Sequence, residues 1–423
     1  MKHKYLRLLI LAAVCLNLFG CSGETYEEET EAAAEEVILP VTFRADPTTN
    51  QSDNLSFVQD FNEAFAGEYY MDAEWLTETS GGYRNKIKQW NVLDEMPVLI
   101  TDAGFDYDFY QILIENDRLV NLRPYMEASE FWMDVMNPDV LADCTEEDGG
   151  IYLAPLGSNV HTYAGIIYNE ELLASVGYDT FPTTWDEFWE CLDALQSAGI
   201  TPLALHGSGS YWVPMLFATA YLYSSPEGQE FLNEGFPESF QRLSVKDMMN
   251  MLKKLFTYTF SDALELDYDQ TAQRFLNDEA AIIANGKWMF DSIPEEEKEV
   301  LRFTCFPEQI LMNSPRMSAW AATTGYSEEV TEGAVKALEF RIQCEQEEAK
   351  TVINNTADPL QASYGETITQ EHTIMPNYQL QWEQEIQNEF FTAYMPGFLN
   401  GSTTLSDFLI MLDERIHQIE SKK

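Results

Sequence analysis

The segment Phe275–Phe290 contains, in close succession, the end of one helix, a short apolar run and the start of another helix. The apolar run Ala280–Ala284 has the length of a buried strand. Asn285 and Gly286 supply a turn after it, and Trp288 follows where the next helix begins. Open α/β sheets bind ligands at the carboxyl ends of their strands. The segment therefore predicts an α/β sheet with Trp288 at its ligand-binding edge, although a core tryptophan after an ordinary turn would fit the same residues.

Strand and helix patterns alternate along the chain. Val37–Phe43, Tyr69–Leu76 and Pro97–Thr101 have the composition of strands, and helical patterns separate them. This alternation is typical of βαβ units and predicts the α/β class. Asn169 and Thr184 are residue types that cap the helices following them. Further strands are expected at Gly149–Leu156, Ala164–Asn169, Phe303–Phe306 and Met317–Ala322, and further helices at Asn85–Trp90, Trp185–Ala198 and Thr331–Asn354.

Residues 1–20 have the features of a bacterial lipoprotein signal peptide. Three basic residues precede the apolar run Leu8–Leu18, which is too short to span a bilayer comfortably. The end of the segment, Leu18–Cys21, resembles a lipobox, where cleavage precedes a cysteine that is then acylated with fatty acids such as palmitate. Polar residues follow at once, which disfavours a retained membrane anchor. We therefore expect a mature chain that begins at a lipidated Cys21, with the acidic residues 21–36 as a flexible tether.

Charge and size narrow the function classes. The chain has 423 residues with 45% hydrophobic content, enough for two or three domain-sized units. Its formal charge is −47, and removal of the signal peptide, which carries three basic and no acidic residues, makes it −50. Nucleic acids and anionic membrane surfaces are bound by clusters of Lys and Arg. The composition therefore argues against both as partners.

Catalytic and metal-binding patterns are weak. The loop His206–Ser210 resembles part of a G-x-S-x-G nucleophile elbow, but Tyr211 replaces its last glycine. The five histidines show no metal-ligand spacing. Carboxylates are so abundant that pairs close in sequence carry no information about a glycosidase dyad. We expect no catalysis, no cofactor and no metal.

The cysteines point to buried thiols. Outside the signal peptide and its cleavage site, the chain has no C-x-x-C motif, and four cysteines would allow three pairings that the sequence cannot choose among. Cys191 shares a helix face with Phe188, Leu192 and Leu195, which favours a core position. Free core cysteines are expected rather than disulfides at Cys144, Cys191, Cys305 and Cys344.

Several segments, taken in chain order, resemble those of bacterial extracellular solute-binding proteins of family 1, the maltose-binding-protein-like sugar receptors of ABC importers. Phe275–Trp288 is similar to the family segment F-x-x-G-x-A-A-M-x-x-x-G-x-W, and Leu122–Tyr125 is similar to L-x-P-Y. Phe181–Phe188 and Ala198–Leu205 resemble two further family segments. The resemblance covers residues 38–423 in motif order.

The resemblance implies a two-lobed periplasmic-binding-protein-like fold with a hinge and a ligand cleft between discontinuous lobes. Lobe 1 would comprise residues 37–160 and 320–365, and lobe 2 residues 161–319 and 366–423. It implies a monomer, anchored by lipid to the outer face of the cell membrane. The protein would capture a mono- or oligosaccharide and deliver it to the permease subunits of an ABC transporter.

Candidate ligand-binding residues follow from the chemistry of sugars. Aromatic rings cover the apolar faces of a sugar, and planar polar side chains bind its hydroxyl groups. In the family, the tryptophan that corresponds to Trp288 commonly stacks on a sugar ring. A packing or hydrogen-bonded structural role competes for Trp320, Arg316 and His161. The expected site residues are Asp46, Asp102, Tyr163, Tyr211, Trp212, Trp288, Arg316 and Trp320.

Two other function classes stay open from the sequence. A secreted carbohydrate-active hydrolase would need a carboxylate pair across a cleft, and glycoside turnover would reveal it. A ligand receptor for a sensor kinase would use the same fold with another partner. Within the binding class, polyamine, metal and peptide ligands are alternatives, although aromatic residues on loops favour sugars.

Overall fold

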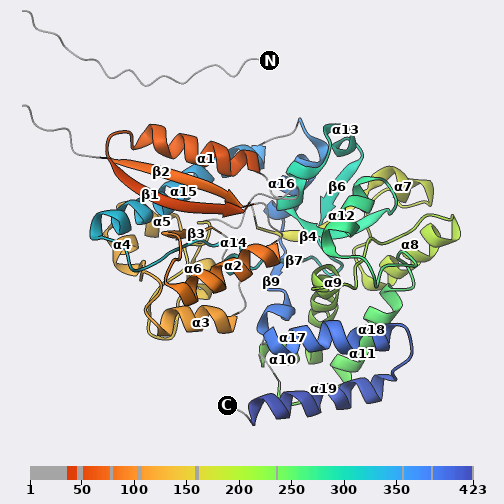
Figure 1. Ribbon diagram of the computed structural model, residues 1–423. Helices are drawn as coiled ribbons and strands as arrows, with labels where there is room; N and C mark the ends of the chain where they lie inside the picture. The colour runs from red at the N-terminus through yellow and green to blue at the C-terminus, as the bar shows by residue number, and fades with distance from the viewer. Residues whose placement is uncertain are drawn as a thin grey trace, which may run out of the picture. The chain divides into compact units, whose positions relative to one another are not determined.

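Two separate β-sheets organise the structure, a computed structural model that describes residues 36–44, 51–76, 80–101, 107–157, 162–234, 237–354, 357–382 and 384–421 (Figure 1). These residues belong to one compact unit that begins at Glu36. The expected signal peptide, most of the tether, Cys21, Asp46, Asp102 and His161 lie outside the described residues. Within the described ranges, no helix is both long and apolar enough to cross a membrane.

The first sheet has the strand order β2-β1-β3-β8. Strands β2, β1 and β3 run parallel, whereas β8 pairs with β3 in the antiparallel direction. Successive side chains of a strand point to opposite faces, and Leu39, Val41 and Phe43 of β1 share the buried face. The bounds are Val37–Arg44 for β1, Tyr69–Leu76 for β2, Leu99–Ile100 for β3 and Ala321–Ala322 for β8.

Helices flank the first sheet, and Figure 1 shows α1 and α15 lying along β1 and β2. Phe340 of α15 packs against Phe57, Phe61 and Phe65, which follow one another along α1 and its end. The helices are α1 (Gln51–Ala64), α2 (Ser80–Leu93), α3 (Tyr107–Glu115), α4 (Arg123–Ala128), α5 (Trp132–Val135), α6 (Pro138–Asp143), α14 (Pro315–Ser318) and α15 (Glu328–Asn354).

The second sheet has the order β5-β4-β7-β9, and β6 also pairs with β4. Strand β4 is antiparallel to β5, β6 and β7, and β9 is parallel to β7. Ile166, Ile167, Ile282 and Ile283 are buried in its core. The strands are β4 (Ala164–Asn169), β5 (Ile282–Gly286), β6 (Leu301–Thr304), β7 (Ile310–Met312) and β9 (Thr373–Met375).

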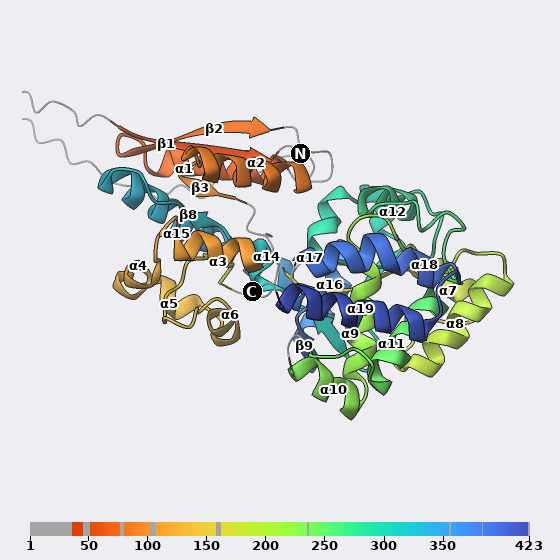
Figure 2. The ribbon, with the colours of Figure 1, turned by 60° about the horizontal axis from the view of Figure 1, so that its bottom comes forward.

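The helices around the first sheet and that sheet form the first group of elements, and those around the second sheet form the second group with it. The C-terminal helices α17, α18 and α19 lie together in the second group (Figure 2). Arg415 of α19 forms ion pairs with Glu385 of α17 and with Glu389, which follows α17, and these pairs join α19 to that part of the chain. The helical segments of this group are α7 (Glu170–Ser175), α8 (Trp185–Ser197), α9 (Trp212–Tyr223), α10 (Pro226–Asn233), α11 (Leu243–Leu255), α12 (Tyr268–Leu276), η1 (Lys287–Ser292), α13 (Glu295–Lys298), α16 (Pro359–Thr369), η2 (Tyr378–Gln381), α17 (Gln384–Asn388), η3 (Glu389–Tyr394), α18 (Met395–Leu399) and α19 (Leu405–Glu420).

Each sheet has its own hydrophobic core, and the chain passes between the two groups more than once. Ala154 and Trp320 exchange both backbone hydrogen bonds, at 2.7 and 3.0 Å, on the side of the first sheet. Ala164 of β4 pairs with Met312 of β7 on the side of the second sheet. The connections that begin after Ala154 and after Met312 therefore lie side by side at both of their ends. Leu360 of α16 packs in the second core. That core therefore already includes a residue before 366, the position after α15 at which lobe 2 was expected to resume.

Most expected elements are present, but the strands predicted at Gly149–Leu156 and Met317–Ala322 are only partly formed. Residues 149–156 contribute only isolated bridges, Ile151 to Thr145 and Ala154 to Trp320, and the side chains of Arg123 and Asn121 also hold this loop. Residues 315–318 form a helical turn that begins at Pro315, since a proline fits the first position of a helix. The strand that follows is reduced to Ala321–Ala322.

The N-caps and the buried cysteine are confirmed. Asn169 Oδ1 accepts the backbone N–H of Leu172 at 3.1 Å, and Thr184 Oγ1 accepts that of Glu187 at 3.3 Å. Cys191 is fully buried. All four cysteines of the described chain are free thiols, and Cys344 is the one with partial exposure.

Candidate ligand-binding site

Trp288 presents an exposed aromatic ring at the end of β5. It is the second residue of η1, and 43% of its surface is exposed although its neighbours Met289 and Phe290 are buried. The six-membered ring folds back over Gly286, where an added Cβ would overlap ring atoms Cε3, Cζ3 and Cη2. The backbone of Gly286 is extended, with φ −120°, which any residue can adopt. Glycine is therefore required here for space and not for its backbone conformation.

A line of hydrogen bonds holds the edge of the same ring. Trp288 Nε1 donates to the Tyr268 hydroxyl at 3.2 Å, and this hydroxyl donates to Asn285 Oδ1 at 2.9 Å. The Asn285 side chain is fully buried, and its Oδ1 also accepts the Gly286 N–H at 2.9 Å. Burial raises the pKa of Tyr268, so its hydroxyl keeps the proton that it donates. Trp288 is thus fixed in position while part of its surface faces solvent.

A second loop reaches the same end of the second sheet. Leu203 pairs with Ile282 in the parallel direction, and Ala204 N–H donates to the Ile282 carbonyl at 2.8 Å. The loop from His206 to the start of α9 therefore leaves the sheet where β5 ends. The His206 ring lies 6.0 Å from the Tyr268 ring in an edge-to-face arrangement. This contact connects the loop before α9 to the residues that hold Trp288.

His206 caps α9 as a neutral side chain. It is fully buried, and its Nε2 accepts the backbone N–H of Val213 at 3.3 Å. Burial lowers the pKa of His206 to about 4, so Nε2 remains an acceptor at neutral pH. Trp212, the first residue of α9, is partly buried against the same core. Its backbone N–H donates to Ser210 Oγ at 3.4 Å.

Tyr211 and Tyr163 lie behind this surface. Tyr211 is buried, has a left-handed backbone with φ 55°, and stacks on Phe391 with ring centroids 5.3 Å apart. Tyr163 is also buried and meets His372 edge to face at 5.5 Å. The Tyr163 carbonyl accepts the Lys287 N–H at 3.2 Å, beside Trp288. In this conformation both tyrosines pack in the core beneath the exposed ring of Trp288, which we call the platform.

Arg316 and Trp320 belong to the first group of elements. Arg316 donates to Glu146 Oε1 at 2.7 Å and to the Asp143 carbonyl. Trp320 is 6% exposed and meets Phe57 edge to face at 5.3 Å. Both side chains are therefore engaged by residues of the first group.

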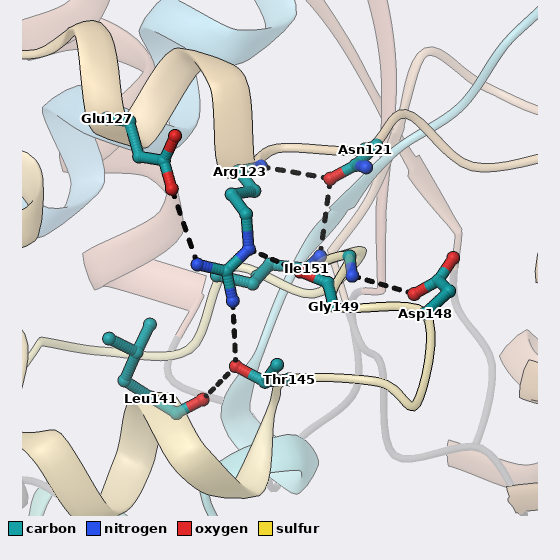
Figure 3. A network of polar contacts seen from close by, with 9 residues as sticks. Asn121, Arg123, Glu127, Leu141, Thr145, Asp148, Gly149 and Ile151 are labelled. Atoms are coloured by element: carbon teal, nitrogen blue, oxygen red, sulfur yellow. Dashed lines mark hydrogen bonds and ion pairs between the residues drawn. The ribbon is translucent and has the colours of Figure 1, made fainter.

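The loop that carries Glu146 is held by its own polar network (Figure 3). The Arg123 guanidinium donates to the Gly149 carbonyl and to Thr145 Oγ1. Asn121 Oδ1 accepts the Arg123 N–H at 3.1 Å and the Ile151 N–H at 3.3 Å. These contacts order the loop around Glu146 and thereby place the carboxylate that binds Arg316.

The sequence predicted Trp288 and Trp212 as site residues but not the residues that hold the Trp288 ring. Tyr268 has a visible local signal, because Asp267 and Gln270 form a capping box that places it at the start of α12. Nothing in the sequence pairs its hydroxyl with Asn285 and Trp288. Among the described residues, no group of three or more His, Cys, Asp or Glu could hold a metal ion.

A hollow on α2 is a second candidate surface for a ligand. An open hollow of about 560 Å³ lies on α2, lined by Asn85, Lys88, Gln89, Val92 and Leu93. No aromatic ring lines it. It therefore lacks the group that binds the apolar face of a sugar, and the surface at Trp288 is the better candidate.

Residues 56–357 match the family of bacterial extracellular solute-binding proteins. The chain belongs to this family. A probable sugar-binding periplasmic protein of Brucella melitensis biotype 1 is 28% identical over 196 residues, which is 45% of this chain and 44% of the relative. The solute-binding protein thus aligns with less than half of that relative's length.

Solved structures show the same fold as this solute-binding protein. A chitin oligosaccharide binding protein has a TM-score of 0.72 at 20% identity and covers 90% of this chain and 98% of its own. A Streptococcus pneumoniae solute-binding protein in complex with the blood group A-trisaccharide has a TM-score of 0.69 at 15% identity, covering 90% and 99%. The expected family and the two-lobed α/β fold are confirmed.

Proposed function

We propose that this solute-binding protein captures a mono- or oligosaccharide outside the cytoplasm and delivers it to the permease subunits of an ABC importer, without chemical conversion. The observation that carries the proposal is the fixed and exposed ring of Trp288 at the carboxyl end of β5. Relatives named as sugar-binding proteins support the ligand class.

The chemistry of the platform fits a carbohydrate better than a charged ligand. An aromatic face matches the C–H face of a sugar ring through apolar and dispersion contacts. The ammonium of Lys287, the residue before Trp288, lies over the Phe290 ring, 5.1 Å from its centroid. A neutral ligand needs no opposing charge at the platform, and hydroxyl groups can be bound by polar side chains at its rim.

The position of the platform supports a ligand-dependent closure of the lobes. Gly286 pairs with Ala164, the first residue of β4, directly after the segment that comes from the first sheet. Met312, before the returning segment, pairs with the same residue. A ligand on Trp288 therefore lies beside both connections. Contacts that it makes with the first lobe would exist only in the closed state and would shift the population toward it.

The anchoring of the protein forms part of the proposal. The lipobox-like end of the signal segment would place a diacylated cysteine at position 21, and residues 22–36 would tether the folded part to the membrane. We expect the protein to act as a monomer. Asp46 and Asp102, which follow the expected strands of lobe 1, remain proposed ligand contacts from the opposite lobe.

A thermal-shift screen tests the function. The panel contains galactose, maltose, xylotriose, N,N′-diacetylchitobiose and the blood group A-trisaccharide, with putrescine and a tripeptide as non-sugar ligands. We expect at least one sugar to raise the melting temperature and neither non-sugar to do so. Release of reducing sugar from the bound oligosaccharide would instead favour a hydrolase, and a shift with putrescine or the tripeptide alone would contradict a carbohydrate receptor.

A further inference from the structure

We infer that Tyr268 and Asn285 are positioning residues that hold the Trp288 indole against Gly286, so that a ligand meets one face of the ring and never its N–H group. The part of this inference that concerns ligand binding rests on the proposed function. The part that concerns the ring is a property of the unliganded protein.

The first support is the cover on one face of the indole. A Cβ built on Gly286 would lie at nearly equal distances from three consecutive atoms of the six-membered ring. An approach from the ring edge would instead bring one atom much closer than the two beside it. The Cα of Gly286 therefore lies under the ring face. Since 43% of Trp288 is exposed, the opposite face is the one that solvent and ligands reach.

The second support is the direction of the hydrogen bonds. A phenol has a single proton, and that of Tyr268 goes to Asn285 Oδ1 at 2.9 Å. Its oxygen lone pair is then available to the indole, whose N–H donates at 3.2 Å. An indole nitrogen is a donor only, so its one hydrogen bond is already made. It is therefore not available to a sugar hydroxyl.

The third support is the rigidity of the last member of this line. Asn285 is fully buried, its Nδ2 lies 3.0 Å from the Met289 sulfur, and its Oδ1 accepts the Gly286 N–H. The orientation of its amide is thus set by two neighbours. Tyr268 is held in turn against His206. The exposed ring is therefore held at its N–H edge by Tyr268 and covered on one face by Gly286.

Two consequences follow for recognition. Because the ring is already oriented, binding loses less side-chain freedom than with a mobile tryptophan. Because the N–H group is occupied, selectivity among sugar hydroxyls must come from other residues, and Trp288 selects for an apolar sugar face. Removal of the Tyr268 hydroxyl should then weaken binding about three- to tenfold, the value of one hydrogen bond of typical net strength.

The test uses the indole N–H signals of the full mature chain labelled with 15N-tryptophan, and the Trp288 signal is assigned by W288F. In the unliganded protein we expect this N–H to exchange slowly with water, despite the exposed ring. Y268F should shift the signal and accelerate its exchange, and G286A should displace it. The matched control Y152F removes a hydroxyl that donates to Asp148 at 2.8 Å in the first group of elements, and should leave it unchanged.

The ligand part uses the panel sugar that gives the largest thermal shift. Addition of this sugar should shift the signals of the carbon-bound ring protons of Trp288, while the Trp288 N–H should still exchange slowly with water. A Trp288 N–H that exchanges freely in wild type, or is unaffected by both Y268F and G286A, overturns the positioning role. A Trp288 N–H signal that shows a new hydrogen bond to a sugar hydroxyl overturns face-only contact. If no sugar of the panel binds, the proposed function fails while the unliganded spectra still decide the positioning role.

Discussion

The guanidinium of Arg341 lies over the ring of Trp320, 4.3 Å from its centroid. Arg341 also donates to the Ser318 carbonyl at 2.8 Å and to the Ala154 carbonyl at 3.4 Å. Ala154 precedes one of the connections between the two sheets, Ser318 lies in the other, and Trp320 follows that second connection. A single side chain of α15 therefore fixes the first-lobe ends of both connections.

The substitution R341A tests this anchor. It removes two charge-assisted hydrogen bonds and the stacked cation, so we expect a loss of about 3 kcal/mol in the free energy of unfolding. Urea unfolding followed by circular dichroism measures it. The control K350A removes an exposed ion pair with Glu347 from the same helix and should change the free energy by less than about 0.5 kcal/mol. Equal effects of the two substitutions would show that Arg341 does not anchor the connections.

His206 makes stability depend on pH in a defined window. Burial holds its pKa at about 4, below the ordinary value of 6.5. Above pH 6.5 the side chain is neutral in both states and adds no pH dependence. Between pH 6.5 and 4 the unfolded chain gains a proton that the folded protein does not, so stability falls as the pH is lowered.

The expected loss over this window is about 3 kcal/mol. H206Q keeps a side-chain acceptor for the Val213 N–H but cannot titrate. Urea unfolding at pH 7.5 and pH 4.5 should therefore show a fall in stability that is smaller in H206Q than in wild type by about 2 to 3 kcal/mol. An equal fall in both proteins would mean that His206 is protonated in the folded state near its ordinary pKa.

How far the sequence predicts this molecule depends on the distance over which each signal acts. The cap at Thr184, the strand Ala164–Asn169 and the place of Trp288 after a strand rest on neighbouring residues, and all three appear in the structure. The strand before Trp288 lies two residues later than expected, at Ile282–Gly286, because Gly286 still pairs with Ala164.

The roles of other candidate residues depend on partners far along the chain. Tyr211 stacks on Phe391, and Arg316 pairs with Glu146, and neither partner is marked by a local pattern. A loop aromatic and a lone arginine have the same appearance in sequence whether they face a ligand or a core. Tyr268 was missed for the same reason, since its hydroxyl acts on a residue of another element.

The proposed lipid anchor gives a prediction about processing. C21A removes the only nucleophile that the lipobox-like segment offers for acylation. We expect the variant to remain unprocessed or to be released from the membrane, because lipid and tether together hold the mature chain there. Membrane fractionation and mass spectrometry of the N-terminus measure both. Wild-type protein found in the medium with another N-terminus would contradict the anchor.

Closure of the lobes should accompany binding. At ligand about 100 times the Kd, the folded state gains roughly 2.7 kcal/mol. For a chain of this size the melting temperature then rises by only about 3 °C, from the unfolding entropy per residue. Small-angle scattering should show a smaller radius of gyration with the sugar present. A thermal shift without a change in the scattering curve would indicate a rigid pocket.

The central claim is that a sugar binds on the ring of Trp288, and calorimetric titration tests it most directly. The panel sugar with the largest thermal shift is titrated into wild type, W288A and Y70A, since Tyr70 is an aromatic residue of similar exposure, 42%, on β2. We predict that W288A weakens binding by about 2–4 kcal/mol, as for a buried aromatic anchor, while it folds normally and Y70A binds like wild type. A folded W288A that binds the sugar as tightly as wild type would contradict the account.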